Sequence, residues 1–367
     1  MSLNLNSSNI HEHFMHLALM QAKKALGNTK GNPSVGCIIV KNNSVIGADC
    51  TGINGRPHAE EKAISKLNKN NKNLNLYVTL EPCSHKRKSG PCVKLISKKN
   101  INKVYISIKD PDIRSYDKAA KKLRKKGLYV KYGILQKKIK NFYKSYIISK
   151  KETSPFVTCK LAISNDSYIV NKKNRWITNY QSRARGHLLR SFHDCIITSS
   201  KTINDDNPSL NCRINGLQKN TPFRIILDTN LKIKIKSKVL NDQHKNKTII
   251  FYNKNNKKKI NFLKKSKIKL YKISCGTNAK INLHEALLKA KELGFSRIYL
   301  ESGIKLIKSF FKENLINDFK IFISKDNLGT NGYINVKKEL YYFLKNKKKS
   351  REIVNLNGDL FLSYIIK

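Results

Sequence analysis

Hydrophobic residues in the first third of the chain switch between helical and strand-like spacing. Apolar side chains of residues 11–26 recur every three or four positions, which predicts an amphipathic helix with Gly27 as its C-cap. Residues 35–46 hold two short apolar runs joined by Asn42-Asn43, which predicts a β-hairpin. Strands that alternate with helices over the rest of this region predict a three-layer α/β domain. We expect further strands at residues 76–80, 104–108 and 128–132, and further helices at residues 58–67, 91–98 and 117–126.

The later part of the chain repeats this alternation and predicts a second α/β domain. A length of 367 residues also exceeds what a single domain usually reaches. Residues 149–154 are polar and precede Pro155, so we predict a boundary there between domains at 1–148 and 155–367. Residues 241–272 are dominated by Lys and Asn and are expected to form a solvated, variable excursion around one or two strands. Strands are predicted at residues 156–163, 195–199, 223–228, 248–252, 297–301 and 318–323.

The formal net charge of +50 has two interpretations. A nucleic-acid partner would explain it, because Lys and Arg neutralise phosphates. Compositional drift also explains it, because Lys and Asn, both of which have A/T-rich codons, crowd every segment. The basic residues are spread along the chain with few aromatic residues between them to stack on bases. We therefore favour drift and do not expect a nucleic-acid partner, although the field would still attract a phosphorylated small substrate.

The sequence shows no membrane or secretion signal. Its apolar runs stay well below the ~18 residues of a membrane span. Residues 1–10 are polar and Asn-rich and lack the apolar core of a secretory signal. The 8 cysteines are scattered, which is typical of reduced thiols and metal ligands rather than of a disulfide framework. We expect a cytoplasmic protein without a membrane partner.

His58, Cys83 and Cys92, together with Glu60, form the strongest chemical pattern in the sequence. One His and two Cys suit a catalytic zinc site whose fourth position is left for water. Cys83 is expected just after a strand and Cys92 at the start of a helix, where a thiolate is favoured. His58 is expected in the first turn of its own helix. Glu60 is expected over the open position, where it would pass a proton from the attacking water to the ring nitrogen and the departing amine.

The spacing of these residues bears on the class of zinc site. Zinc deaminases show H-x-E followed by P-C-x-x-C. Here the first half fits, whereas Cys83 and Cys92 are nine positions apart (92 − 83) instead of three. A structural zinc site is the alternative, but it would usually need a fourth protein ligand, and His85 is the only near candidate. The pattern therefore favours hydrolytic deamination of an amino-pyrimidine ring.

The motif around the two cysteines resembles a known family. Residues 79–85 (Thr-Leu-Glu-Pro-Cys-Ser-His) with Gly90-Pro91-Cys92 resemble the bifunctional riboflavin-biosynthesis deaminase–reductases. That family carries eight residues between its two cysteines, as this chain does. Asn32-Pro33-Ser34-Val35-Gly36 matches the family's N-P-x-V-G loop, which implies that Asn32 contacts substrate. The resemblance implies a cytidine-deaminase-like first domain.

The second half resembles the reductase domain of the same family, which is similar to dihydrofolate reductase and uses NADPH. Residues 160–164 resemble its opening strand, and residues 176–178 match its W-I-T motif. Residues 198–213 follow its T-x-x-x-D-x-P-x-L-x-x-R run, and residues 301–303 match its glutamate and glycine loop. Gly303 is also expected to open a helix, whose N-terminus suits a phosphate. The resemblance implies cofactor contacts at Ala162, Trp176, Thr202, Asp206, Thr229 and Gly303, and substrate contacts at Asn174, Arg190, Leu210, Arg213 and Glu301.

The resemblance implies two cofactors, Zn²⁺ and NADPH, and a phosphorylated pyrimidine substrate. The first domain is expected to remove the 2-amino group of 2,5-diamino-6-ribosylamino-4(3H)-pyrimidinone 5′-phosphate, and the second to reduce the ribosyl unit to ribityl. A homo-oligomer is also expected. The chain departs from the family pattern at Lys62, Arg87 and Ser167. Two alternatives stay open: a nucleic-acid base deaminase, which the charge favours, and a degenerate protein with only one activity.

Overall fold

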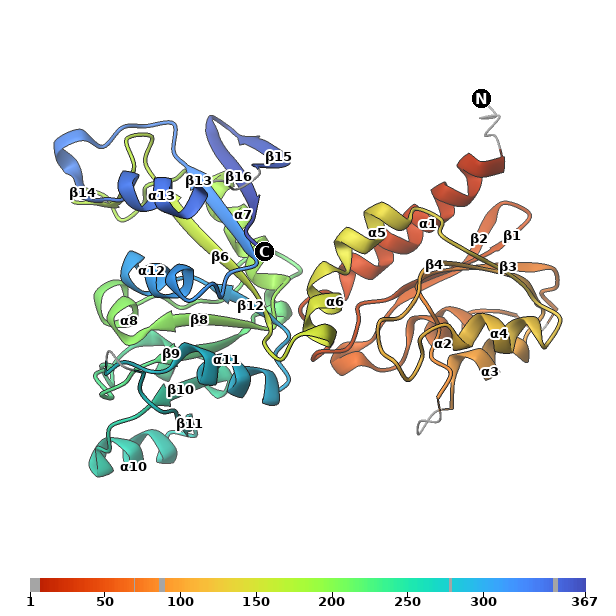
Figure 1. Cartoon of the computed structure of the whole chain (residues 1–367), viewed down its shortest axis with the longest axis horizontal. Coiled ribbons are helices and arrows are strands. Elements are labelled where there is room, and N and C mark those ends of the chain that lie inside the picture. Colours follow the sequence, from red (N-terminus) through yellow and green to blue (C-terminus); the bar gives the residue numbers. More distant parts are fainter. Residues whose placement is uncertain (1–6, 69, 86–89, 277–278, 346–348) are drawn as a thin grey trace. The chain divides into compact units, whose positions relative to one another are not determined.

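The computed structural model describes residues 7–68, 70–85, 90–276, 279–345 and 349–367 (Figure 1). The chain divides into two compact units, residues 1–153 and 154–367. Both units combine helices with a central β-sheet.

The first unit is a five-stranded sheet with the order β2-β1-β3-β4-β5. Strand β1 pairs antiparallel with β2 and β3, whereas β3, β4 and β5 run parallel. Helices α1, α5 and α6 lie on one side of the sheet, and α2, α3 and α4 lie on the other (Figure 1). The predicted three-layer architecture is therefore present. The strands are Gly36–Lys41, Ser44–Cys50, Leu74–Leu80, Ile101–Ile108 and Tyr129–Tyr132, and the helices are Ser7–Lys24, Ala59–Ile64, Cys92–Ser97, Lys118–Arg124, Gln136–Phe142 and Lys144–Lys151.

Local sequence explains the hairpin between β1 and β2. Asn42 and Asn43 both adopt positive φ angles, 46° and 62°, and Lys41 pairs with Ser44 across the turn. A two-residue loop with two left-handed residues matches the right-handed twist of the strands, and Asn tolerates that backbone better than most residues do. The predicted hairpin is confirmed, with β2 longer than expected.

The sequence prediction missed the last two helices of this unit. Helix α6 covers residues 149–151, which belong to the polar stretch where we predict the domain boundary. Its side toward the domain buries Tyr146, and Tyr143 just before it is also buried. A short helix anchored by two aromatic residues has too few apolar positions to show a clear helical period. The polar stretch is therefore partly the end of a helix.

The second unit contains a nine-stranded sheet with the order β11-β10-β9-β8-β12-β6-β13-β16-β15, and β7 pairs with β14 in a separate two-stranded sheet. The strands from β11 to β13 run parallel, and β16 and β15 are antiparallel additions. All six strands that we predicted here by residue range are present, and β11 lies in residues 241–272, where one or two strands were expected. Strands β7, β14, β15 and β16 were missed. The strands β6–β16 are Phe156–Ile163, Tyr168–Asn171, Cys195–Ser199, Phe223–Leu227, Thr248–Tyr252, Lys269–Lys272, Arg297–Leu300, Asp318–Ile323, Gly332–Asn335, Lys349–Leu356 and Asp359–Ile365.

Two apolar clusters cover the faces of this sheet. One contains buried residues of α11 and α12, and the other contains buried residues of α7, α8, α9 and α10. The parallel part is therefore covered on both faces, as parallel sheets require. The helices α7–α13 are Tyr180–Ser191, Ser200–Asp206, Lys238–Asn241, Lys257–Lys265, Leu283–Glu292, Ile304–Lys312 and Lys337–Leu344.

The Lys- and Asn-rich residues 241–272 are better ordered than the sequence suggested. They form β10, α10 and β11, which build one edge of the nine-stranded sheet. Leu263 of α10 is fully buried, and Ile260 packs against the same cluster. The expected solvated excursion is therefore wrong in part, because a few apolar positions dock the segment while most of its lysines face water. Lys247 and Lys259 are half-buried and donate to backbone carbonyl oxygens. No helix in the described part of the chain has the length and hydropathy that crossing a membrane needs.

Candidate active sites

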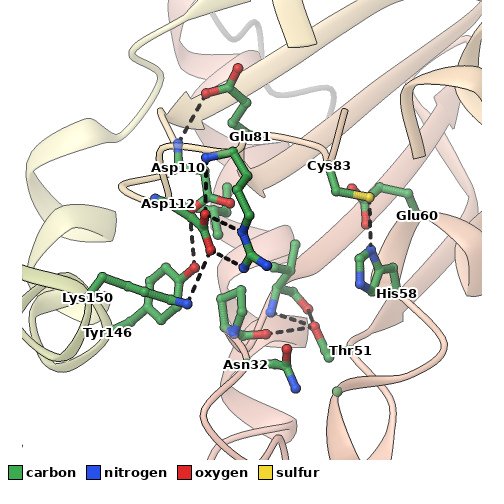
Figure 2. Close-up of a pocket in the computed structure, with 15 residues that line it drawn as sticks. Asn32, Thr51, His58, Glu60, Glu81, Cys83, Asp110, Asp112, Tyr146 and Lys150 are labelled. Atoms are coloured by element: carbon green, nitrogen blue, oxygen red, sulfur yellow. Dashed lines mark hydrogen bonds and ion pairs between the residues drawn. The ribbon is translucent and has the colours of Figure 1, made fainter. Parts of the chain in front are cut away.

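Three elements of the first unit bring His58, Cys83 and Cys92 together. His58 is the N-cap of α2, one position before the first turn where we had placed it. Cys83 follows β3, and Cys92 is the first residue of α3. His58 Nδ1 lies 3.1 Å from Cys92 Sγ and 3.5 Å from Cys83 Sγ, and the three ligand atoms lie within 4.8 Å of one another. Figure 2 shows the side chains of His58 and Cys83 facing each other.

This donor set fits a zinc ion. A tetrahedral ion with Zn–N near 2.1 Å and Zn–S near 2.3 Å holds nitrogen and sulfur about 3.6 Å apart. The observed separations of 3.1 and 3.5 Å come close to that value. One imidazole and two thiols are also ligands that zinc prefers, and three protein ligands leave a position for a reactant. The residues therefore match a catalytic zinc site.

The two thiols are electrostatically unequal. A hydrogen bond from Cys92 lowers the pKa of Cys83 to about 3, against the effect of burial. The pKa of Cys92 is raised, first by that same hydrogen bond and then by burial. Opposite shifts are what one proton shared between two sulfur atoms produces. A divalent cation ionises coordinating thiols outright, so both cysteines are suited to bind it as thiolates.

Glu60 lies in the first turn of α2, two residues after His58. Its side chain is buried at 3 % exposure, and it lines the same pocket as His58 and Cys83. Figure 2 shows its carboxyl group beside these two ligands. Burial raises the pKa of Glu60. A buried carboxyl group next to the ligands is suited to carry a proton.

Asn32 forms another wall of this pocket. Its Nδ2 donates to the carbonyl oxygens of Thr29 at 3.0 Å and Asn54 at 3.3 Å, which leaves Oδ1 as an acceptor. The Asn32 side chain packs against Gly55, where a Cβ atom would come within 2.2 Å of Nδ2. Gly55 also has a φ of 87°, so both space and backbone require glycine there.

The pocket also contains acidic residues that the sequence reasoning did not single out. Asp110 accepts hydrogen bonds from Tyr146 Oη at 3.1 Å and from the Asp112 backbone at 3.0 Å. Burial raises the pKa of Asp110 to about 6. Tyr146 lies 36 positions from Asp110 on a helix that we did not predict, so no local pattern could have linked them.

Two of the sequence departures can be located in the structure, and both are accommodated. Lys62 Nζ contacts Asp49 and donates to the Cys50 carbonyl oxygen at 3.3 Å, outside the residues that line the pocket. Ser167 adopts a φ of 69°, a left-handed backbone that glycine tolerates better. Arg87 lies outside the described residues.

In the second unit, Glu301 and Arg190 form a bidentate ion pair. Arg190 Nε and Nη2 donate to Glu301 at 2.8 and 2.7 Å. Burial acts to raise the pKa of Glu301, but the charges of Arg190 and Lys160 outweigh it and lower the pKa to about 2. Glu301 therefore stays ionised. Lys160 on β6 was not among our candidates, although a lysine inside an otherwise apolar strand is a signal that could have found it.

His187 connects Arg190 with Arg213. Its Nδ1 lies 3.0 Å from the Asn211 carbonyl oxygen, and its Nε2 accepts from Arg213 Nε and Nη2 at 3.2 and 3.0 Å. Burial and the two arginine charges lower the pKa of His187 to about 4. The imidazole is therefore neutral and holds the Arg213 guanidinium. Arg213 is itself exposed, so its remaining donors face solvent.

The loop before α12 is held by hydroxyl groups. Thr202 Oγ1 contacts Ser199 Oγ and Ser302 Oγ at 3.0 Å each and accepts from the Gly303 backbone at 3.2 Å. Gly303 is the N-cap of α12, and a Cβ atom there would meet only Thr202 Oγ1 at 3.9 Å. The predicted helix after Gly303 is confirmed. Its open, amide-rich N-terminus fits the phosphate groups of a dinucleotide.

The remaining predicted contact residues vary in their exposure. Trp176 is 49 % exposed, and the guanidinium groups of Arg175 and Arg183 lie 5.2 and 4.9 Å from its ring centre. Leu210 is 2 % exposed, so its side chain is not available to a ligand. Thr229 Oγ1 already accepts from the Ile281 backbone at 3.3 Å. Asn174 and Asp206 are exposed, and Ala162 is half-buried.

Comparisons with known proteins agree with this division. A family model described as the RibD C-terminal domain matches residues 155–352. A second model, the cytidine and deoxycytidylate deaminase zinc-binding region, matches residues 8–108. The chain is 30 % identical to riboflavin biosynthesis protein RibD of Aquifex aeolicus, over 97 % of this chain and 98 % of that protein. It is 31 % identical to RibD of Bacillus amyloliquefaciens, over 87 % of this chain and 86 % of that protein.

Solved structures show the same fold. A deaminase/reductase from Thermotoga maritima aligns with a TM-score of 0.83 at 25 % identity, over 99 % of this chain and 100 % of that one. RibD of Acinetobacter baumannii aligns with a TM-score of 0.83 at 24 % identity, over 98 % and 100 % of the two chains. These matches confirm the predicted fold class, a cytidine-deaminase-like unit followed by a reductase unit.

Proposed function

Because the chain belongs to the RibD family of riboflavin biosynthesis proteins, we propose that its first unit hydrolyses the 2-amino group of 2,5-diamino-6-ribosylamino-4(3H)-pyrimidinone 5′-phosphate. The second unit then reduces the ribosyl unit of the product to ribityl with NADPH. The protein is a bifunctional enzyme, a zinc-dependent deaminase joined to a reductase. The observation that carries the proposal is the convergence of His58, Cys83 and Cys92 beside the buried carboxyl group of Glu60.

In the deaminase unit, we propose that His58, Cys83 and Cys92 hold zinc and that Glu60 carries the proton. A zinc ion bound there supplies a water molecule of lowered pKa as the nucleophile. Glu60 accepts the proton of the attacking water and delivers it to the ring nitrogen and then to the departing amine. Asn32 offers Oδ1 to a ring N–H group and so orients the pyrimidine.

In the reductase unit, the protein positions its two reactants. NADPH supplies the hydride. Gly303 and Thr202 at the start of α12 hold its phosphates, and Trp176 offers a flat wall to its rings. The other proposed cofactor contacts are Ala162, Asp206 and Thr229.

The substrate of the second unit is held by the charged network around Glu301. Arg213, fixed by His187, contacts the phosphate, whereas Arg190 contacts the substrate with its remaining donors and keeps Glu301 in place. Asn174 and the Leu210 backbone complete the substrate contacts. The pKa of Lys160 is lowered by burial, so its ammonium group is suited to give a proton to the opening sugar oxygen.

A reconstitution experiment tests both halves. The purified chain, loaded with zinc, should release ammonia from the phosphorylated pyrimidine, and mass spectrometry should then show a gain of two hydrogens only when NADPH is added. NADH serves as the matched cofactor control. Ammonia release without the later reduction would leave only the deaminase half of the proposal standing, and no ammonia release would refute the deaminase half.

Location and assembly stay predictions. We propose a cytoplasmic protein that forms a homo-oligomer and has no nucleic-acid partner. The two-unit organisation supports a small-molecule substrate over a flipped nucleic-acid base. Salt-dependent RNA binding by the purified chain would favour the alternative.

A further inference from the structure

The pocket next to Glu60 contains two cationic side chains that the deamination chemistry does not use. Arg114 and Lys150 both line it, and among the described lining residues they are the only arginine or lysine. Neither was a candidate in the sequence. A substrate that places its amino group near Glu60 therefore meets these cations with another part of its structure.

One carboxylate holds both cations in place. Arg114 Nε and Nη2 donate to Asp112 Oδ1 and Oδ2 at 2.8 and 2.5 Å, and Lys150 Nζ donates to Oδ2 at 3.2 Å. Arg114 uses only one edge of its fork for Asp112, and Lys150 only one of its three N–H bonds. Donors therefore remain on both side chains for a further acceptor, and their positions are set in advance.

Two cations, Arg114 and Lys150, and three carboxyl groups, Asp110, Asp112 and Glu81, line this end of the pocket, and only the cations offer hydrogen-bond donors to an anion. Asp112 is a single anion between two cations, and the Arg114 hydrogen bond keeps its pKa far below the usual range. Glu81 is satisfied by the backbone N–H groups of Asp110, Asp117 and Ala119 at 3.2, 3.0 and 2.9 Å. Its negative charge is therefore already compensated by backbone donors.

The position of Lys150 on helix α6 determines where its side chain points. Tyr146 and Lys150 are four positions apart, so they lie on one face of the helix. Tyr146 Oη donates to Asp110, and Lys150 contacts Asp112, two residues further along the same loop. Figure 2 shows Lys150, Tyr146 and Asp112 on one side of the pocket and His58, Cys83 and Glu60 on the other.

We propose that Arg114 and Lys150 bind the 5′-phosphate of the deaminase substrate. With the pyrimidine ring at Glu60, the ribosyl phosphate extends toward the opposite side of the pocket, where both cations lie. A phosphate has several acceptor oxygens, so it can bridge the Arg114 fork and the Lys150 ammonium. This inference rests on the proposed function and adds to it: the deaminase discriminates a phosphorylated ribosyl-pyrimidine from its dephosphorylated form.

Paired substrates test this inference. Ammonia release is measured with the phosphorylated pyrimidine and with the same compound after phosphatase treatment, in wild type, Arg114→Gln and Lys150→Gln. Each variant should lower the ratio of the two kcat/KM values about tenfold, as loss of one charge-assisted hydrogen bond predicts. Lys151→Gln, the matched control, removes the same charge from the next position of α6, outside the pocket, and should leave the ratio unchanged. An unchanged ratio in both pocket variants overturns the proposal.

A binding experiment separates this inference from the proposed function. Calorimetry on the zinc-loaded full chain carrying Arg213→Gln, which removes the phosphate contact proposed in the second unit, should detect ribose 5-phosphate but not ribose, and the further change Lys150→Gln should weaken that binding about tenfold. Zinc content and the melting temperature of each variant check that the fold is intact. If wild type releases no ammonia but binds ribose 5-phosphate through Lys150, the deaminase proposal fails while the phosphate site stands. Equal ribose 5-phosphate binding with and without Lys150→Gln in the Arg213→Gln chain overturns the site whatever the activity.

Discussion

The two candidate sites differ in what fixes their charges. In the first unit, Cys83 and Cys92 have opposite pKa shifts because they share a proton, and a divalent cation would decide the state of both. In the second unit, Arg190, Glu301 and His187 fix one another through direct hydrogen bonds. The charge state of the first site depends on a bound ion, whereas the charge state of the second site depends on its own side chains.

This difference predicts where activity and stability are coupled. Glu60 lies among His58, Cys83 and Cys92 and forms no ion pair with an arginine or lysine in the described part of the chain, so its loss should remove a step of the reaction rather than part of the fold. Glu301 compensates the guanidinium of Arg190, whose side chain is only 14 % exposed, so its loss should disturb reaction and fold together. Four predictions sharpen or break this contrast.

Glu60→Gln should have the largest effect on rate. Because the amide cannot carry the proton, deamination should fall by up to ~10⁴-fold. Zinc content should stay the same, since Glu60 is not among the ligand atoms. The reductase, supplied with the deaminated substrate, should keep its activity. Glu61→Gln, which removes the neighbouring charge outside the pocket, is the control. Ammonia release within tenfold of wild type would show that another group carries the proton.

Glu301→Gln should affect both the activity and the stability of the second unit. Removing one partner of a fully buried ion pair costs about 3–5 kcal/mol, because the other charge is left uncompensated, and this partly exposed pair should lie at or below the lower end of that range. Hydrogen exchange followed by mass spectrometry should show faster opening of residues 154–367 and unchanged protection of residues 1–153. Deamination should persist while reduction is lost. Glu292→Gln, an exposed carboxylate at 64 % exposure, should change neither. If Glu301→Gln and wild type showed equal protection from hydrogen exchange, the ion pair would not couple activity to stability in the second unit.

The same contrast explains how much of each site the sequence predicted. His58 and Glu60 stand in one short motif, and Cys83 and Cys92 flank one loop, so the ligand set could be inferred from spacing and predicted elements. In the second unit, Arg190 and Glu301 are 111 positions apart, and only the family resemblance indicated them. His187 gave no signal, because its role depends on two arginines that the fold brings to it.

Whether a strand could be predicted from the sequence depended on whether it contains an apolar run. The buried parallel strands have continuous apolar runs and were all found, for example β8 and β10. Strand β15 is rich in polar and charged residues, so its sequence lacks the apolar run of a buried strand. Arg114 and Lys150 were missed because a shared contact with Asp112, 38 positions from Lys150, leaves no periodic pattern.

Lowering the pH should change the stability of the two units differently, with a smaller effect than the substitutions above. Burial lowers the pKa of His193 to about 3, well below its unfolded value, so its stabilising effect is present above pH 6.5 and is lost as pH falls toward 3. Between pH 6.5 and 5 this amounts to about 2 kcal/mol. Asp110 in the first unit has the opposite sign, since its raised pKa of about 6 favours the folded state more at pH 5 than at pH 7.

Hydrogen exchange at pH 7 and pH 5, corrected for the intrinsic exchange rate, measures this difference. The second unit should lose more protection than the first. His193→Gln should flatten the pH dependence of residues 154–367, whereas His284→Gln, at 65 % side-chain exposure, should not. Equal losses in both units would show that surface charge, rather than the buried imidazole, dominates the acid response.

Ser167→Gly should give the smallest effect, and it should raise stability without changing either activity. Ser167 holds a φ of 69° in the turn before β7, where its N–H bonds the Ser164 carbonyl oxygen at 3.0 Å. A left-handed backbone costs a non-glycine residue about 1–2 kcal/mol, which glycine would not lose. The greater conformational freedom of glycine in the unfolded chain offsets part of this stabilisation. A net increase of about 0.5–1 kcal/mol in the second unit is expected. Ser266→Gly, at a φ of −76°, has no such strain to relieve and should be destabilising instead. If both substitutions destabilised the unit, the turn would favour serine for its side chain, and the departure at Ser167 would be an adaptation rather than a tolerated strain.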